Sequence, residues 1–177
     1  MSARREELLD LAESLLETEG LEGFGIGALA RAASIKPPSL YKHFSSAQDI
    51  EHALISRGFL ELSVRLHGAT PAGSGSLASP TTHFDAFASA YRSFARERPQ
   101  RYRLMTERPL VRAALVPGAE QAAMSELLAF FGETEDSHDR SRAAWAAAHG
   151  MVSLELSGRF PPGADLDAAW RVIGRAF

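Results

Sequence analysis

The 177-residue sequence contains no cysteine. This absence excludes disulfide bonds, thiolate nucleophiles and cysteine-ligated zinc sites. The sequence also has no run of about 18 apolar residues, which is what a membrane-spanning helix requires. The first residues are charged and no apolar stretch precedes Leu8, so we expect no secretory signal. Together these absences predict a cytoplasmic protein with no membrane partner.

The sequence contains only two lysines, Lys36 and Lys42. Its formal net charge is −3. This balance predicts weak non-specific affinity for DNA but does not exclude DNA binding, since the distribution of charge matters more than its sum. Residues 1–57 hold six basic and nine acidic side chains. Between Gly23 and Gln48, however, there are three basic side chains and no acidic one. Both lysines lie in this acid-free segment.

Most of the chain shows the 3.6-residue apolar periodicity of amphipathic helices. The first helix should end near Gly20, a residue suited to a left-handed cap. The sequence Ser45-x-x-Gln48 has the form of a capping box and should open a long fourth helix. The other expected helices span residues 26–33, 38–44, 84–95, 100–107, 118–131, 137–158 and 166–177. No apolar alternation is long enough for a convincing strand, so we predict an all-α fold of about nine helices.

Residues 26–44 are predicted to form two short helices joined by a tight turn, as in a helix-turn-helix. Prolines fit the first turn of a helix, so we expect the second helix to run from Pro38 to Phe44. Leu40 and Phe44 are four residues apart and should both face the core. The ring of Tyr41 should pack at the edge while its hydroxyl stays available to a phosphate.

The polar side chains of this second helix suit DNA. Hydroxyl, ammonium, imidazole and phenol groups can contact phosphates and base edges in the major groove, and a helix N-terminus attracts phosphate. The predicted DNA-binding residues are Lys36, Pro38, Ser39, Tyr41, Lys42 and His43. The alternative for Lys42 and His43 is an ordinary solvated face, which the acid-free surroundings disfavour. Arg4 and Arg5 are expected in a solvated tail rather than in an arm that reaches DNA.

Three motifs in this part of the chain carry a family resemblance. They are Ile26…Leu29-Ala30, Leu40-Tyr41-Lys42-His43-Phe44 and Asp49-Ile50. With the first amphipathic helix they resemble the TetR family of transcriptional regulators over residues 6–57. A second segment, Ala144-Trp145-x-x-x-His149-Gly150-x-x-x-Leu154-Glu155, is similar to the Trp-His-Gly segment of one C-terminal subgroup of that family.

The resemblance implies a helix-turn-helix head over residues 1–46 and a connecting helix over residues 47–67. An effector-binding and dimerisation domain would follow over residues 81–177. By composition, residues 68–80 form a flexible linker. The last two helices, residues 140–158 and 166–177, would form a homodimer interface as a four-helix bundle.

Several residues depart from the family pattern. Gly25 replaces the serine or threonine that usually caps the second helix, and Gly27 weakens that helix further. Ser34 replaces the usual turn glycine. Ala47 replaces a lysine that is usual near the start of the fourth helix and that would contact a phosphate. We therefore expect modest DNA affinity.

The C-terminal part is rich in aromatic side chains, and the resemblance implies that its helices enclose an apolar cavity with a few polar groups. The candidates for lining this cavity are Tyr91, Tyr102, Met105, Trp145 and His149. The alternative is that the aromatics only form core and that His149 is a hydrogen-bonded buried histidine.

The sequence thus predicts a ligand-responsive transcriptional regulator, most often a repressor. Its homodimer would leave a palindromic double-stranded DNA operator when a small apolar effector binds. We expect no catalytic residue, cofactor or metal site. The string Gly25–Ala30 fits G-x-G-x-x-A but lacks a preceding strand, and the six histidines have no i, i+4 pairing. Alternatives are a helical carrier or enzyme with a vestigial helix-turn-helix, and a purely structural helical dimer.

Overall fold

The computed structural model describes residues 2–70, 80–131 and 135–177. Within these ranges the chain forms nine α-helices and one short 3-10 helix, with no strand. The prediction of an all-α fold of about nine helices is therefore confirmed. Most of the predicted linker over residues 68–80 lies outside the described residues. No described helix is long and apolar enough to cross a membrane.

The chain divides into two compact units. The head unit contains residues up to Phe59 together with Arg98–Glu120, and the second unit contains Leu60–Glu97 and Gln121–Phe177. Residues 98–120, which the domain prediction assigned to the C-terminal domain, thus pack with the head. The predicted boundaries of the functional domains stay a prediction.

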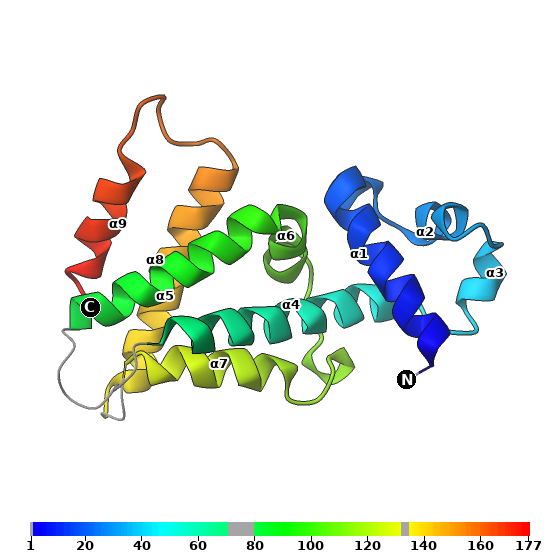
Figure 1. The fold of residues 1–177 in the computed structure, drawn as a ribbon, viewed down its shortest axis with the longest axis horizontal. Coiled ribbons are helices and arrows are strands. Elements are labelled where there is room, and N and C mark those ends of the chain that lie inside the picture. The colour runs from blue at the N-terminus through cyan, green and yellow to red at the C-terminus, as the bar shows by residue number, and fades with distance from the viewer. Residues whose placement is uncertain (1, 71–79, 132–134) are drawn as a thin grey trace. The chain divides into compact units, whose positions relative to one another are not determined.

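Five helices build most of the head unit (Figure 1): α1 (Ala3–Gly23), α2 (Ile26–Ala32), α3 (Pro37–Leu40), the first half of α4 (Ala47–Ala69) and α6 (Pro99–Glu107). The short η1 (Arg112–Ala114) follows α6. Gly20 has a φ of 72°, so the regular part of α1 ends there as predicted, and one further turn continues to Gly23.

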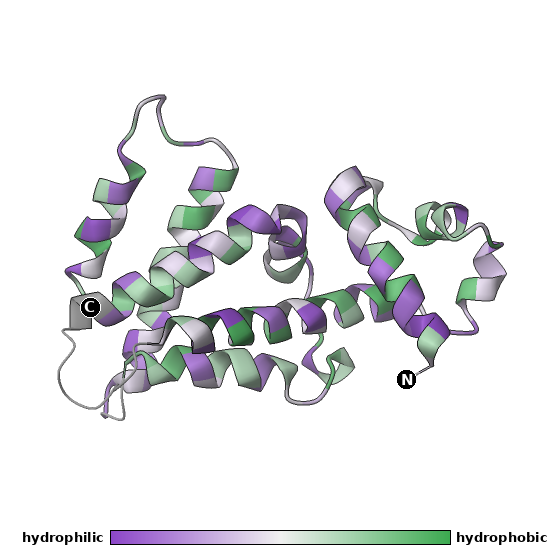
Figure 2. Cartoon of the chain, viewed as in Figure 1, coloured by the Kyte–Doolittle hydropathy of each residue, from purple (hydrophilic) through white to green (hydrophobic). Residues whose placement is uncertain are grey.

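The core of the head unit is apolar and formed mainly by leucines. Leu8, Leu16 and Leu29 are almost completely buried, and so are Leu40 and Phe44. Hydrophobic and hydrophilic residues both occur along α1 and α4 (Figure 2). Burying one leucine or phenylalanine side chain stabilises the fold by about 1.5–3 kcal/mol. The predicted inward positions of Leu40 and Phe44 are therefore confirmed.

The turn between α2 and α3 is a Schellman motif. The amide of Ile35 donates to Ala30 O and the amide of Ser34 donates to Arg31 O, each at 3.0 Å. These are the two hydrogen bonds that define the motif, and they require a left-handed residue just after the helix. Ser34 takes that conformation with a φ of 54°. It is the only described residue other than glycine with a positive φ.

Helix α4 begins at Ala47, as predicted, but its capping side chains differ from the predicted pair by one residue. Ser46 Oγ accepts a hydrogen bond from the amide of Asp49, and Asp49 Oδ2 accepts one from the amide of Ser45 at 2.8 Å. The capping side chains are therefore Ser46 and Asp49, whereas Ser45-x-x-Gln48 had been predicted. An ionised carboxylate accepts hydrogen bonds more strongly than an amide does, which favours Asp49 over Gln48 in this role.

Side chains of α4 also form hydrogen bonds to the backbone of the segment that follows α6, at Val111 and Val116. His52 is buried, with Nδ1 2.7 Å from Gln48 O and Nε2 accepting from the amide of Val111. Ser56 Oγ accepts from the amide of Val116. Two residues further on, a Cβ at Gly58 would collide with Met105 Sδ, so this glycine lets α6 pack closely against α4.

The second unit is built from the rest of α4, α5 (Pro80–Glu97), most of α7 (Ala119–Ala129), α8 (Ser137–Leu156) and α9 (Leu166–Gly174). Its α5 packs against α8 and α9. The core between them is aromatic. Phe84 stacks on Phe177 with ring centroids 4.9 Å apart, and Phe87 meets Phe130 edge-on at 6.0 Å. Helices α8 and α9 end earlier than predicted, at Leu156 and Gly174.

Candidate nucleic-acid interface

The predicted DNA-binding residues lie around α3, at the surface of the head unit. Lys36, Pro38 and Lys42 are exposed, and Ser39 and His43 are half-buried. The burial of Leu40 anchors this segment and turns the polar side chains outward. The structure therefore brings the six predicted residues together on one short stretch of surface.

Two details of this segment were predicted incorrectly. Regular α-helix ends at Leu40, and residues 41–43 form a hydrogen-bonded turn in place of a helix extending to Phe44. The turn brings Phe44 into the core, where its amide donates to Leu40 O at 3.0 Å. Tyr41 does not pack its ring, because 54% of the residue is exposed. Tyr41 thus exposes more to solvent than its hydroxyl alone.

Three cations lie at this surface: Arg31, Lys36 and Lys42. Within the part of the chain that the structure describes, no acidic side chain forms an ion pair with Arg31, Lys36 or Lys42. All three residues are exposed. An unpaired surface cation is available to a phosphate without first breaking an internal contact.

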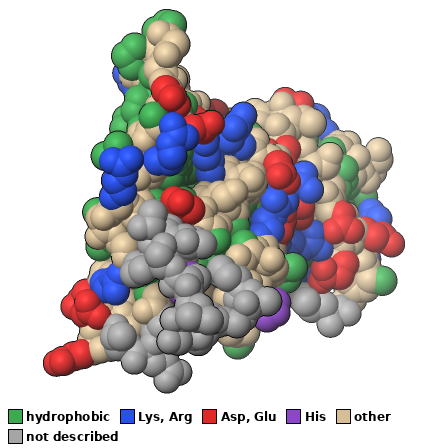
Figure 3. Space-filling model, turned by 60° about the vertical axis from the view of Figure 1, so that its left-hand side comes forward, with side chains coloured by type: hydrophobic (Ala, Val, Ile, Leu, Met, Phe, Trp, Pro, Cys, Tyr) green, Lys and Arg blue, Asp and Glu red, His purple; other side chains and the backbone are tan. Residues whose placement is uncertain are grey.

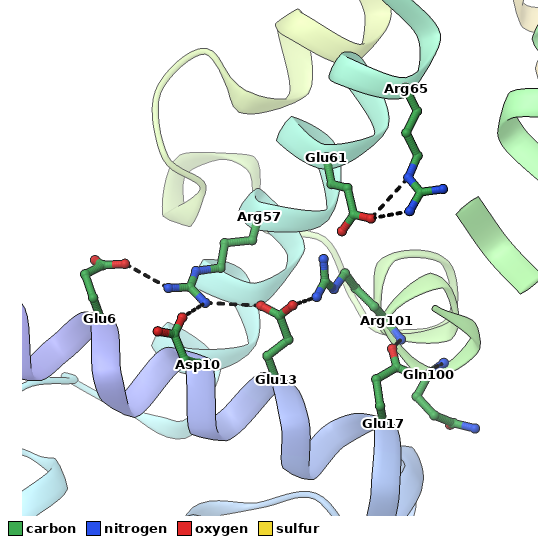
Figure 4. Close-up of polar contacts among 9 residues, drawn as sticks. All are labelled: Glu6, Asp10, Glu13, Glu17, Arg57, Glu61, Arg65, Gln100 and Arg101. Atoms are coloured by element: carbon green, nitrogen blue, oxygen red, sulfur yellow. Dashed lines mark hydrogen bonds and ion pairs between the residues drawn. The ribbon is translucent and has the colours of Figure 1, made fainter. Parts of the chain in front are cut away.

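The acidic residues of the head unit point elsewhere. Glu6, Asp10 and Glu13 lie along one face of α1, and all three bind the guanidinium of Arg57 on α4, at 2.8, 2.7 and 3.1 Å (Figure 4). Burial alone would lower the pKa of Arg57, but its hydrogen bonds to Glu6 and Asp10 outweigh that effect and raise it. These carboxylates therefore hold α1 against α4 and do not oppose DNA at α3.

The same face of α1 binds α6. Glu13 forms an ion pair with Arg101, a residue whose burial lowers its pKa. Glu17 accepts hydrogen bonds from the amides of Gln100 and Arg101 at 3.2 and 3.0 Å (Figure 4). A carboxylate at a helix N-terminus satisfies free amides and interacts favourably with the helix dipole. The spacing of acidic residues along one face of the first helix was the sequence signal that could have predicted these contacts of α1 with α4 and α6.

Arg5 has a role that the sequence analysis missed. Its Nε donates to His43 O at 3.3 Å, and its Nη2 lies 3.2 Å from Asp49 Oδ1. Its guanidinium also sits 4.8 Å from the centroid of the Phe44 ring. Arg5 is therefore part of α1 and fixes the turn that connects α3 to α4, in place of the expected solvated tail.

The departures from the family pattern have visible consequences. Gly25 caps α2 without any side-chain hydrogen bond. Ala47 is exposed at the start of α4 and carries no group that could bind phosphate. Both observations fit the expectation of modest DNA affinity, which stays a prediction.

The predicted effector-binding residues fall into two groups. Tyr102 and Met105 belong to the head unit, where Met105 packs against Gly58. Tyr91, Trp145 and His149 belong to the second unit and lie together. Trp145 Nε1 donates to Tyr91 Oη at 3.2 Å, and the rings of Trp145 and His149 are 6.1 Å apart. Burial lowers the pKa of His149, so its imidazole is neutral near pH 7.

Comparisons with known proteins bear on both units. Residues 8–54 match the family described as bacterial regulatory proteins, tetR family, and residues 84–177 match the tetracyclin repressor-like C-terminal domain. The uncharacterized HTH-type transcriptional regulator Rv0681 of Mycobacterium tuberculosis is 30% identical over 159 residues, which are 87% of this chain and 71% of that protein. The subgroup suggested by the Trp-His-Gly segment stays a prediction.

Solved structures have the same fold. A protein of unknown function from Rhodococcus sp. RHA1 is 27% identical, with a TM-score of 0.76 over 99% of this chain and 93% of that one. The multidrug binding protein EbrR, complexed with imidazole, is 22% identical, with a TM-score of 0.69 over 99% and 95% of the two chains.

TetR-family proteins are DNA-binding transcriptional regulators, which favours the predicted regulator over a helical carrier or enzyme. The helix-turn-helix residues, their buried anchors and the matches to both parts of the chain lead to one conclusion. This chain belongs to the TetR family of bacterial regulatory proteins.

Proposed function

We propose that the protein is a homodimeric repressor that acts in the cytoplasm and binds a palindromic operator through the surface around α3. The partner is double-stranded DNA, and a small apolar effector releases it. The match to a repressor-like C-terminal domain supports repression over activation. The observation that carries the proposal is the set of exposed, unpaired cations at an acid-free surface beside a buried Leu40–Phe44 anchor.

The six residues proposed to contact DNA are Lys36, Pro38, Ser39, Tyr41, Lys42 and His43. Their groups suit two kinds of contact. The ammonium groups of Lys36 and Lys42 would contact phosphates, which positions the protein. The exposed ring of Tyr41 and the imidazole of His43 would lie nearer the base edges. The two α3 segments of the dimer would enter major grooves one helical turn apart, about 34–36 Å.

Operator binding measured over a range of salt concentrations tests this proposal. Footprinting on the promoter fragments of the source genome should find a palindromic site whose affinity falls as salt rises. Lys42→Ala should weaken that binding and reduce the slope of log K against log salt by about 1. Arg159→Ala, an exposed arginine of the second unit, is the matched control and should bind like the parent protein. Equal binding by all three proteins would contradict the assignment of α3.

The proposed dimer interface uses α8 and α9, the last two helices. Trp145 and Leu154 on α8 are 42% and 45% exposed, and Val172 on α9 is 63% exposed. Exposed apolar side chains are typical of surfaces that pack against another copy, and these three lie on the two helices to which the family resemblance assigns the dimer interface. Val172→Glu should therefore raise the fraction of monomer in sedimentation velocity. Val64→Glu on α4, at a more exposed position of the same unit, should not.

The proposed effector contacts in the second unit are Tyr91, Trp145 and His149. Tyr102 and Met105 belong to the head unit, and their part in effector binding stays a prediction from the sequence. An aromatic group with a neutral imidazole suits an apolar ligand that carries a hydrogen-bonding group. The binding of imidazole by EbrR, a structural neighbour, is consistent with this chemistry. Nile red can serve as an apolar probe. Its fluorescence should rise with the parent protein and rise less with Trp145→Ala, whereas Arg159→Ala should leave it unchanged.

A further inference from the structure

A groove of about 380 Å³ runs between α5 and α9 in the second unit. This volume lies within the range of small-molecule sites. Arginine and acidic side chains gather on the corresponding face of the molecule (Figure 3). None of the five predicted effector residues lines the groove, so it is a different location from the proposed effector site.

One of the arginines in the groove has a structural role. Arg92 binds both carboxylate oxygens of Glu155, at 2.8 and 3.0 Å, and Asp167 at 2.6 Å. The hydrogen bond to Glu155 is the main reason that its pKa is raised. The guanidinium also lies 5.8 Å from the centroid of the Trp170 ring. Arg92 is therefore fully occupied in holding α9 and α8 to α5.

Two other arginines are much less constrained. Arg96 on α5 is 3.8 Å from Glu155, and Arg171 on α9 is 3.8 Å from Asp165. Both separations are longer than a hydrogen bond. Their side chains are 60% and 61% exposed. These two guanidiniums line the groove from opposite walls, together with Asp167. The hydrogen bond from Arg92 is the main cause that lowers the pKa of Asp167, and the charges of Arg171 and Arg96 lower it further. Because the carboxylates paired with Arg96 and Arg171 lie at 3.8 Å, beyond hydrogen-bond distance, both guanidiniums can still donate hydrogen bonds to a ligand carboxylate or phosphate.

The wall between these arginines adds neutral donors and an apolar floor. Ser89 and Ser93 line the groove on the α5 side, one helical turn apart. Trp170 lines it from α9 and is 6% exposed. Among the residues that the structure describes, the indole N–H of Trp170 has no hydrogen-bond acceptor although it is buried. The indole nitrogen has almost no accessible surface, so a ligand in the groove would contact the ring of Trp170 rather than its N–H.

Asp85 adds a second carboxylate to the groove, besides Asp167. Asp85 lies eleven residues before Arg96 on α5, which is about 16 Å along the helix at a rise of ~1.5 Å per residue. It lies beside Gly174, where an added Cβ would be 2.8 Å from Asp85 Oδ1. A carboxylate at this end disfavours a second negative charge on the ligand.

We propose that the α5–α9 groove binds a small organic monoanion. Its carboxylate or phosphate head would sit between Arg96 and Arg171, and its apolar body would lie over Trp170 toward Asp85. This is a second ligand site of the protein, and it is independent of the proposed effector and operator sites.

Calorimetric titration of the full-length protein tests the proposal with benzoate and benzamide, two molecules of the same shape that differ in charge. Benzoate should bind saturably and about tenfold more tightly than benzamide, as expected for one hydrogen bond to a charged group. Arg96→Gln and Arg171→Gln should each weaken benzoate binding about tenfold. Arg159→Gln, which removes an exposed arginine outside the groove, should leave it unchanged.

A second measurement locates the ligand. The indole N–H resonance of Trp170 should shift during the benzoate titration, and it should not shift in Arg96→Gln at the same concentrations. Because both arginines are exposed, circular dichroism should show that the variants are folded. Equal affinity for benzoate and benzamide, binding that survives both arginine substitutions, or an unmoved Trp170 resonance would each overturn the proposal. Phenyl phosphate in place of benzoate distinguishes a phosphate head from a carboxylate head.

Discussion

Replacing Ser34 by glycine should stabilise the head unit. Ser34 occupies the left-handed position of the Schellman motif after α2, with a φ of 54°. For a residue with a Cβ this conformation costs roughly 1–2 kcal/mol, whereas glycine adopts it freely. The side chain of Ser34 is exposed and makes no hydrogen bond among the described residues, so the substitution removes no native contact.

The magnitude follows from two opposing effects. Relief of the left-handed strain contributes about 1–2 kcal/mol. Glycine also increases the conformational entropy of the unfolded chain, which opposes folding by ~0.4–1 kcal/mol. The free energy of unfolding should therefore rise by roughly 0.5–1 kcal/mol, the difference between these two effects.

Urea denaturation of Ser34→Gly and the parent protein, at equal protein concentration, measures this change. Gly158 supplies a reciprocal control, because it occupies the same position of a Schellman motif at the end of α8. Its φ is 63°, and the amide of Arg159 donates to Leu154 O. A Cβ at Gly158 would meet no atom within 4 Å. Gly158→Ser should therefore destabilise the protein by a similar amount through backbone strain alone.

A decrease in the free energy of unfolding for Ser34→Gly would refute this reasoning. The same conclusion would follow if Gly158→Ser were neutral, because the left-handed conformation would then carry no measurable cost. A change in the m-value would instead indicate an altered denatured state.

Three further predictions concern the buried anchors and acid sensitivity. Leu40→Ala should lower the free energy of unfolding by about 2–5 kcal/mol in urea denaturation, because it removes a fully buried side chain, and a loss below 1 kcal/mol would contradict its place in the core. Gly174→Ala should cost about 1 kcal/mol, because the new methyl group would meet the buried ring of Phe84 at 3.2 Å, while the exposed side chain of Asp85 can move aside; Gly150→Ala, with open space around it, should not show this loss. Burial lowers the pKa of His149 in the folded state, so the unfolded chain binds more protons below about pH 6.5 and stability should fall on acidification. His149→Gln should reduce the difference in unfolding free energy between pH 5 and pH 7.5, and an unchanged difference would exclude His149 as its source.

The helix-turn-helix could be predicted from sequence because its signals are local. Pro37 and Pro38 mark the start of α3, and the spacing of Leu40 and Phe44 identifies its buried face. The length of α3 could not be predicted in the same way. It depends on where the chain must turn to bury Phe44 and to reach the cap at Ser46, and that is a tertiary constraint.

The contacts of charged side chains were much less predictable. Charge alone did not reveal that Arg5 binds the α3–α4 turn or that Arg57 meets three carboxylates of α1. Such pairs join residues that are 38–51 positions apart in the sequence. Many other oppositely charged side chains could pair with the same arginine, so its partner cannot be identified from charge alone. Tyr41 was wrongly expected to pack its ring because an aromatic residue beside a buried leucine often does so, and only the course of the chain decides otherwise.

The ion-paired carboxylates of α1 bear on how the protein would search a genome. Since Arg57 and Arg101 are held by these acids, neither arginine adds its charge to indiscriminate contact with the DNA backbone. Non-specific DNA would then bind only a small fraction of the protein molecules in the cell, and most of them would diffuse freely between encounters with DNA. Occupancy of the operator would depend on a handful of sequence-reading contacts. Such a regulator would leave the operator after a small loss of complementarity to it, because little non-specific electrostatic affinity would hold it on the duplex.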